Sequence, residues 1–175
     1  MSSFVVRTAR ETDAERIALI EAEADQMLVA LFQADDWPAP DSAAHRLMLP
    51  GAVLVGESRS GEVAGFAHLL EVDGHAHLEQ VSVLPRFGRR GLGRMLVTSA
   101  LHEAAARGHR EVTLRTYADV PWNAPFYTTC GFVETEPDSA FLTGLLDVEE
   151  RLRLSMHGRR LQMTSPVPSP DVTSG

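Results

Sequence analysis

The hydrophobic pattern of this chain changes its period several times. Short runs rich in valine, leucine and phenylalanine indicate strands, whereas apolar residues that recur every three or four positions indicate helices. Strands are predicted at residues 4–7, 52–56, 63–70, 75–84, 111–117, 132–136 and 152–156. Helices are predicted at residues 12–32, within 34–50, and at 91–107 and 122–130. Periodicity alone therefore gives an α/β or α+β class.

Turn and capping signals set several of these boundaries. Thr12 and Glu15 have the spacing of a capping box and open the first helix. The pair Asp73-Gly74 is a hairpin signal, and Gly108 ends the third helix as a C′ glycine. The first helix is predicted to bury an apolar stripe of Ile17, Ile20, Ala24, Leu28 and Leu31.

Composition narrows the class of protein. The chain has 175 residues, of which 44% are hydrophobic, enough for one domain with an adequate core. We expect that domain at residues 1–158, and a disordered tail rich in Ser, Pro, Thr and Gly at residues 159–175. A single cysteine excludes an internal disulfide framework. With no apolar signal-peptide core and no apolar run of about 18 residues, we expect a cytoplasmic protein.

The charge balance is acidic, since 24 acidic residues against 16 basic ones give a formal net charge of −8. Non-specific nucleic-acid binding requires a basic surface, so nucleic acid is not an expected partner. An acidic surface is compatible with a cationic substrate such as an amine, but it also serves solubility. Three acidic residues of the first helix could either line an amine pocket or form a solvated helix face. They are Glu21, Glu23 and Asp25.

The candidate chemistry begins at residues 81–94, where a strand, a turn rich in glycine and arginine, and the start of a helix are predicted. Unpaired N–H groups and the helix dipole make a helix N-terminus favourable for an anion. Gly91 and Gly93 would let the main chain approach a phosphate closely. The turn lacks the lysine of a P-loop and the third glycine of a dinucleotide fingerprint. The sequence therefore predicts a pyrophosphate site of another kind.

Two motifs together resemble the GCN5-related N-acetyltransferase (GNAT) family. Val83-Leu84-Pro85 followed by Gly91-Leu92-Gly93 fits the end of a strand and the acetyl-CoA signature [QR]-x-x-G-x-[GA], although Gly88 replaces the Gln or Arg. The segment from Asn123 to Tyr127, followed by Gly131-Phe132, is similar to a second block of that family. The resemblance covers roughly residues 4–157. It implies a mixed, mostly antiparallel central sheet of about six to seven strands with helices on both faces.

The resemblance also implies an activity and its co-substrate. We expect an acetyl-CoA-dependent N-acetyltransferase that acetylates a primary amine of a small molecule or peptide by direct transfer in a ternary complex, without a metal. A backbone amide near Val81 or Ser82 would polarise the acetyl carbonyl, where the fourth and fifth strands of the family separate. The residues expected to contact acetyl-CoA are Val81, Ser82, Val83, Gly88, Arg89, Arg90, Gly91, Leu92, Gly93, Arg94 and Asn123. Asn123 would contact the pantetheine arm or cap the short helix.

Acetyl transfer to an amine requires a group that removes a proton. An amine with a pKa near 10.4 is neutral at pH 7 in roughly one molecule per 2,500, which costs about 4.6 kcal/mol. Glu79 is the expected base, because the resemblance places a base on this strand, facing the acetyl group. Strand alternation predicts that Glu79 shares a face with Val81 and Val83. His77 has the same parity and is the alternative base.

The thiolate of CoA requires a proton as it leaves. Tyr127 matches the family tyrosine that lies near the CoA sulfur. A phenol with a pKa near 10 can donate a proton to a thiolate whose conjugate acid has a pKa near 8.5. The alternative interpretation of Tyr127 is a core aromatic residue that packs beneath the sheet.

Other functions compete with this one. A metal held by the histidines of residues 68–77 lacks a supporting Cys or carboxylate pattern, and Cys130 is more typical of a small buried hydrophobe than of a nucleophile. O-acetylation and a longer acyl-CoA are alternatives within the enzymes. A catalytically silent GNAT-like module that binds CoA as a sensor or partner is the alternative outside them. Gly88 favours that module, whereas Tyr127 disfavours it. The motifs leave the acceptor unassigned, and homodimers are common in the family.

Overall fold

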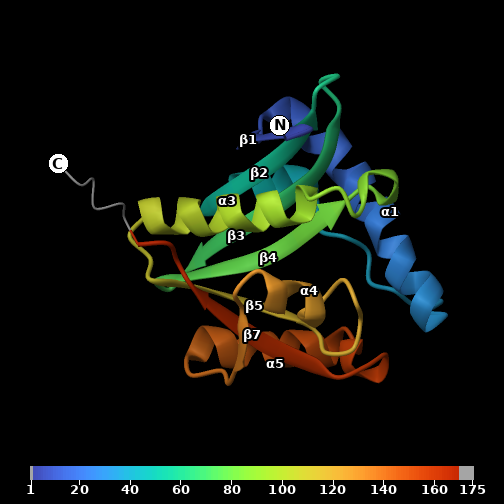
Figure 1. Ribbon diagram of the computed structural model, residues 1–175. Helices are drawn as coiled ribbons and strands as arrows, with labels where there is room; N and C mark the ends of the chain where they lie inside the picture. The colour runs from blue at the N-terminus through green and yellow to red at the C-terminus, as the bar shows by residue number, and fades with distance from the viewer. Residues whose placement is uncertain (1, 170–175) are drawn as a thin grey trace.

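The computed structural model of this chain describes residues 2–169. Its centre is a mixed seven-stranded sheet with the strand order β1-β2-β3-β4-β5-β7-β6 (Figure 1). Neighbouring strands run antiparallel, except that β4 and β5 are parallel. The strands are β1 (Phe4–Thr8), β2 (Gly51–Ser58), β3 (Val63–Val72), β4 (His75–Val83), β5 (Glu111–Tyr117), β6 (Val133–Thr135) and β7 (Arg160–Pro166).

Helices cover both faces of this sheet, which confirms the predicted fold class. Figure 1 shows α3 in front of the sheet and α1 behind it. The helices are α1 (Ala14–Phe32), α2 (Ala43–Met48), α3 (Leu92–Ala106), α4 (Ala124–Thr129) and α5 (Ala140–Arg151). Three single 3₁₀ turns are η1 (Glu11–Asp13), η2 (Pro85–Phe87) and η3 (Leu154–Met156).

The capping box predicted at Thr12 and Glu15 is wrong, because its place is taken by Arg10 and Asp13. The carboxylate of Asp13, and not of Glu15, accepts a hydrogen bond from the backbone N–H of Arg10 at 2.7 Å. Arg7 on β1 also donates to Asp13 at 2.8 Å, and this bond is the largest factor that lowers the pKa of Asp13. The difference arises because η1 precedes α1 and moves the start of the α-helix to residue 14.

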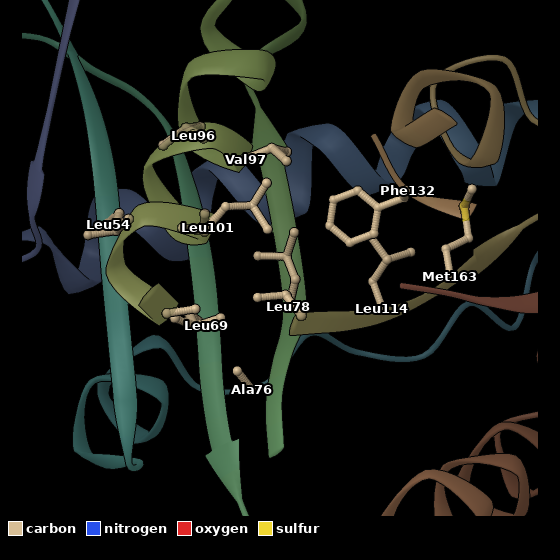
Figure 2. Close-up of a cluster of buried hydrophobic side chains, with 14 of the residues drawn as sticks. Leu54, Leu69, Ala76, Leu78, Leu96, Val97, Leu101, Leu114, Phe132 and Met163 are labelled. Atoms are coloured by element: carbon tan, nitrogen blue, oxygen red, sulfur yellow. The ribbon is translucent and has the colours of Figure 1, made fainter. Parts of the chain in front are cut away.

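The main core lies between α3 and the sheet (Figure 2). It runs from Leu54 and Leu69 on β2 and β3, past Leu78 on β4, to Leu114 on β5 and Phe132 after α4. The core therefore joins the β1–β4 half of the sheet to the β5–β7 half on the α3 side. On that side, a single hydrophobic cluster supports all the elements that carry the predicted cofactor residues.

A second cluster lies under α1, where Ile17 and Ile20 are fully buried beside Phe66 of β3. The predicted apolar stripe fails further along the helix, because Leu31 is 50% exposed. At the end of the helix it is Phe32, and not Leu31, that packs against the fold, with its ring centroid 4.9 Å from that of Tyr117 on β5. Glu21 is instead buried on the same helix, with 4% of its surface exposed.

The C-terminal part of the chain differs from the prediction in three ways. Helix α5 was not predicted, the segment 152–156 forms η3 and not a strand, and the last strand is β7. A tail beginning at residue 159 is therefore wrong for residues 160–166, while residues 170–175 of it lie outside the described residues. The physical reason is that β7 lies between β5 and β6: Leu161, Gln162, Met163 and Ser165 are buried, although Ser and Pro dominate the residues after this strand.

The two halves of the sheet diverge between β4 and β5. Only His77 and Thr113 are paired between these strands, near the start of each. Beyond this point β4 remains paired with β3 as far as Val83, but it has no partner on the β5 side within the described residues. Figure 1 shows the resulting opening between the ends of β4 and β5. In a sheet, backbone groups that lack a partner strand are available to a ligand.

A β-bulge lies in β4 at Glu79. Gln80 pairs with His68 and Leu78 pairs with Leu69, so Glu79 has no opposite residue on β3. A bulge adds one residue and changes the alternation of side chains on either side of it. Leu78, and not Glu79, consequently packs in the same cluster as Val81 and Val83. The predicted shared face of Glu79, Val81 and Val83 is therefore wrong.

Candidate active site

The turn before α3 has a backbone suited to an anion. Gly91, the N-cap residue of α3, adopts φ +86°, a left-handed conformation that glycine accepts without strain. The first helical hydrogen bond runs from the N–H of Met95 to the carbonyl of Gly91. Among residues 2–169, the N–H groups of residues 89–94 have no hydrogen-bond acceptor. This run of free donors at a helix N-terminus can surround a phosphate.

The arginines of this turn are held by other side chains. Arg94 donates to the carbonyl and the hydroxyl of Thr129 at 2.9 and 2.8 Å, which fastens the start of α3 to the end of α4. The guanidinium of Arg90 lies over the ring of Phe87, 5.6 Å from its centroid. Both guanidiniums add positive charge near the free N–H groups, but their positions are set by these contacts. The backbone is therefore the principal donor of the site.

Two glycines of the turn, Gly93 and Gly88, lie where a Cβ atom would contact a neighbouring residue. A Cβ atom at Gly93 would lie 3.4 Å from the ring of Phe126, so this glycine lets α3 and α4 approach closely. A Cβ atom at Gly88 would lie 3.0 Å from the carbonyl oxygen of Pro85. The departure from the family signature at Gly88 thus coincides with a tight contact to η2. The two predicted motifs are in direct contact with each other.

Arg89 adopts φ +59°, a conformation that costs a non-glycine residue about 1–2 kcal/mol. Replacing Arg89 with glycine should therefore stabilise the fold by up to about 1 kcal/mol after the added entropy of the unfolded chain is subtracted. A urea titration measures this difference. The matched control is Arg90→Gly, because Arg90 does not have a positive φ, and this change should destabilise the fold. A loss of stability in Arg89→Gly would contradict the prediction.

Helix α4 carries the predicted tyrosine and asparagine. Asn123 does not cap the helix: its side-chain oxygen accepts a hydrogen bond from the hydroxyl of Thr116 on β5 at 2.6 Å. The ring of Tyr127 packs against Phe126 and Phe132, with centroid distances of 5.2 and 5.8 Å. The Tyr127 hydroxyl has no hydrogen-bond partner among the described residues. Burial raises its pKa, so the phenol is protonated at neutral pH.

Glu79 lies at the β4 bulge with 33% of its side chain exposed, on the edge of the opening. Its Oε2 atom is 3.7 Å from Nε2 of His77, too far for a hydrogen bond. Burial raises the pKa of the Glu79 carboxyl above its ordinary value. A carboxylate with a raised pKa is a stronger base than an ordinary glutamate.

His77 is less suited to the role of base. It is only 3% exposed, and its Nδ1 is 2.8 Å from the hydroxyl of Thr113. Burial is the largest of the effects that lower its pKa to about 4, so the ring is neutral at pH 7. His77 links β4 to β5 at the one paired position between them.

A buried charged cluster on the α1 side of the sheet was not predicted. Arg46 of α2 donates to Glu21 at 2.9 Å and to Nδ1 of His68 at 3.0 Å, and all three residues are at most 4% exposed. Because a guanidinium only donates, Nδ1 of His68 must accept and the ring is the neutral Nε2–H tautomer. Burial raises the pKa of Glu21 to about 7 and lowers that of His68 to about 4.

A second unpredicted cluster lies on the β5 side. Glu149 of α5 accepts two hydrogen bonds from Arg115 of β5, at 2.8 and 3.0 Å. It also accepts two from Arg160 of β7, whose guanidinium lies 4.5 Å from the ring centroid of Tyr117. These residues come from three elements far apart in the sequence, so no local motif could have revealed them.

The geometry does not support the alternative catalytic sites, a nucleophilic cysteine and a bound metal. Burial raises the pKa of the Cys130 thiol, which disfavours a nucleophilic thiolate. Residues 2–169 contain no group of three or more His, Cys, Asp or Glu side chains arranged to hold a metal.

Two depressions of about 150 and 450 Å³ lie near the C-terminal end of α3, away from the turn at its N-terminus. No helix of the described chain is long and apolar enough to cross a membrane.

Comparison with known proteins decides the family. The sequence model of the acetyltransferase (GNAT) family matches residues 18–132. The chain belongs to the GNAT family. This result confirms the resemblance found in the two motifs, and it indicates an acetyltransferase.

Individual relatives agree with this assignment. A mycothiol acetyltransferase from Clavibacter sepedonicus is 34% identical over 99 residues, which is 56% of this GNAT chain and 32% of that protein. The chain therefore spans about a third of the length of that relative. The match therefore concerns one part of that relative.

Solved structures show the same fold. A PaiA N-acetyltransferase from Thermoplasma acidophilum in complex with coenzyme A has a TM-score of 0.68 at 14% identity, with 94% of this chain and 99% of that one covered. A GCN5-related N-acetyltransferase from Rhodopseudomonas palustris has a TM-score of 0.66 at 24% identity, with 95% and 98% covered. The ribosomal-protein-S18-alanine N-acetyltransferase of Escherichia coli has a TM-score of 0.61 at 18% identity, with 98% and 99% covered.

Proposed function

We propose that this GNAT protein transfers the acetyl group of acetyl-CoA to a primary amine by direct transfer in a ternary complex. The observation that carries the proposal is the run of free N–H groups at residues 89–94, on a turn that the Arg94 side chain fastens to α4, together with the unpaired side of β4 that faces β5. A pyrophosphate and a thioester-bearing arm need these two features side by side. Family membership and a structural neighbour in complex with coenzyme A support the same donor.

The free donors fit the chemistry of CoA. The N–H groups of residues 89–94 would bind the pyrophosphate, with Arg89, Arg90 and Arg94 supplying positive charge around it. The unpaired side of β4 at residues 81–83 would bind the pantetheine amides and donate to the acetyl carbonyl. The side-chain NH₂ of Asn123 has no acceptor among the described residues and would hold the arm from the α4 side.

Glu79 would accept the proton of the attacking amine. Its carboxylate lies at the bulge on the edge of the opening, and its raised pKa brings it closer to that of the amine. As the amine nitrogen forms its bond to the acetyl carbon, one N–H proton passes to Glu79, directly or through water. The backbone N–H groups of β4 that face the opening would stabilise the negative charge on the acetyl oxygen. Such a donor is worth about 2.7–4 kcal/mol in other enzymes.

Tyr127 would complete the reaction. When the bond between the acetyl carbon and sulfur breaks, the electron pair remains on the CoA thiolate, and the Tyr127 hydroxyl supplies its proton. The hydroxyl is suited to this role because it has no partner among residues 2–169 and is protonated at neutral pH. The products are then an N-acetylated amine and free CoA, and exchange with water removes the proton from Glu79 and returns one to Tyr127.

The test is amine-dependent release of free thiol. The protein is mixed with acetyl-CoA and a panel of primary amines, and thiol formation and CoA binding are both measured. We expect CoA to bind and at least one amine to raise thiol release well above the rate without acceptor. Tight binding of CoA with no turnover on any amine would contradict the proposal and favour the catalytically silent CoA-binding module.

A further inference from the structure

Carboxylates are in excess on one side of Glu79, and guanidiniums are in excess on the other. Strand β4, which carries Glu79, lies between β3 and β5 in the sheet. On the β3 side, Arg46 is 2.9 Å from Glu21 and 3.6 Å from Asp41. Asp25, one turn after Glu21 on α1, is half-buried and has a raised pKa because of that burial. This side therefore has more carboxylates than guanidiniums.

The β5 side has the opposite imbalance. Glu149 is the shared acceptor of Arg115 and Arg160, whose side chains are only 8% and 15% exposed. The Nη1 atoms of both arginines make no hydrogen bond within the described residues. Two guanidiniums share one carboxylate, which leaves about one unit of positive charge on side chains that are largely buried. The free Nη1 atoms are not among the fully buried atoms that lack a partner, so they are open to an anion that would compensate this charge.

These arginines lie within reach of the position where the amine must react. His77, 3.7 Å from Glu79, is hydrogen-bonded to Thr113, and Arg115 is the next residue of β5 on the same face as Thr113. Two residues of a strand span about 6.6 Å. Arg115 and Glu149 also affect the pKa of His77, and Arg160 affects the pKa of Glu79. A small acceptor could therefore reach both places at once.

Resting on the proposed acetyl transfer, we infer that the acceptor is an amino acid, whose carboxylate binds Arg115 and Arg160 while its amine faces Glu79. A guanidinium fork matches a carboxylate in shape. One unit of excess positive charge matches a carboxylate better than a phosphate dianion. The acidic β3 side then favours the cationic amine on approach, and the basic β5 side fixes the other end. Arg160 is the specificity-determining residue of this arrangement.

The test compares each amino acid with its own carboxamide. The common L-amino acids and their amides are assayed for thiol release with acetyl-CoA, using the wild type, Arg160→Gln and Arg160→Lys. The matched control is Arg159→Gln, because Arg159 is exposed and pairs with Glu134 on the surface. Binding of the N-acetylated products, as acids and as amides, is measured by calorimetry in parallel.

We expect at least one amino acid to exceed its amide in kcat/KM by roughly 10- to 100-fold, the effect of hydrogen bonds to a charged group. Arg160→Gln should remove this preference while turnover of the amide continues, Arg160→Lys should retain part of it, and Arg159→Gln should leave it unchanged. Equal rates for acids and amides, or a preference that persists in Arg160→Gln, would overturn the inference. If no amine is acetylated but acids bind better than amides through Arg160, the proposed reaction fails while the carboxylate site stands.

Discussion

Replacing Glu79 with glutamine is expected to lower kcat by about 10²–10⁴-fold, the usual contribution of a positioned general base. Glutamine keeps the shape of the side chain but cannot accept the proton of the amine. The binding of CoA should change little, because its expected contacts lie at residues 81–94 and 123 and not at Glu79. Steady-state kinetics with saturating acetyl-CoA, together with a CoA titration, separate the two effects.

The pH dependence distinguishes a base from a structural glutamate. Burial raises the pKa of Glu79 above 4.5, and the base is active only as the carboxylate. Activity of the wild type should therefore rise with pH through this raised pKa, and that limb should be missing in Glu79→Gln. A control variant, Glu103→Gln, removes a carboxylate of similar exposure that pairs with Arg107 at the end of α3, and it should keep the wild-type profile. An unchanged profile in Glu79→Gln would remove Glu79 as the base.

The same substitution has a linked effect on stability. Below pH 4.5 Glu79 is protonated in both the folded and the unfolded chain, so the variant and the wild type should have similar stability. As pH rises through the raised pKa of the folded state, the wild type must ionise a half-buried carboxyl, whereas the glutamine side chain of the variant stays neutral. Glu79→Gln should consequently have the higher Tm at pH 8. The gain of stability together with the loss of activity is typical of a functional carboxylate.

Replacing Tyr127 with phenylalanine is the second change with a large expected effect. It removes one hydroxyl and leaves the ring in contact with Phe126 and Phe132. Turnover should decrease by about 10²–10⁴-fold, because the leaving thiolate loses its proton donor. The affinity for CoA should change little. Thiol release and calorimetric titration of CoA measure the two quantities.

A neighbouring hydroxyl provides the control for Tyr127. Thr128→Val removes a hydroxyl that donates to the carbonyl of Ala124 within the same helix. This variant should lose little turnover, which shows that removing a hydroxyl from α4 does not by itself stop the reaction. Turnover of Tyr127→Phe equal to that of the wild type would leave Tyr127 as a packing residue only.

The parts of the fold that the sequence predicted best carry local signals. Gly91 and Gly108 mark the two ends of α3 because each adopts a positive φ there. The strand at residues 111–117 was predicted within its observed bounds, since it is rich in residues of high β-propensity. The turn and α4 were recognised because their motifs are short and contiguous, and the structure brings them into contact at Arg94 and Thr129.

The parts that were missed depend on contacts between distant residues. The bulge at Glu79 is a feature of the β3–β4 register, and the residue types of β4 do not predict it. Helix α5 has a glycine at position 144, and only Leu142 and Glu149 of its twelve residues are buried, so it lacks the run of core residues that marks α1 and α3. The clusters around Arg46 and Glu149 each combine residues from three or more elements. Such sites form only when the sheet is assembled, which explains why the acceptor side could not be predicted.

The backbone N–H groups of residues 89–94 are expected to bind the pyrophosphate of CoA. The most direct test of this binding is the ¹H–¹⁵N NMR spectrum of the protein titrated with CoA and, separately, with pantetheine, which has the same arm but no pyrophosphate. We predict that CoA shifts the amide resonances of residues 89–94 more than any other group, whereas pantetheine shifts those of residues 81–83 and leaves 89–94 nearly unchanged. If CoA binds and the amides of residues 89–94 do not respond, the turn before α3 is not the pyrophosphate site.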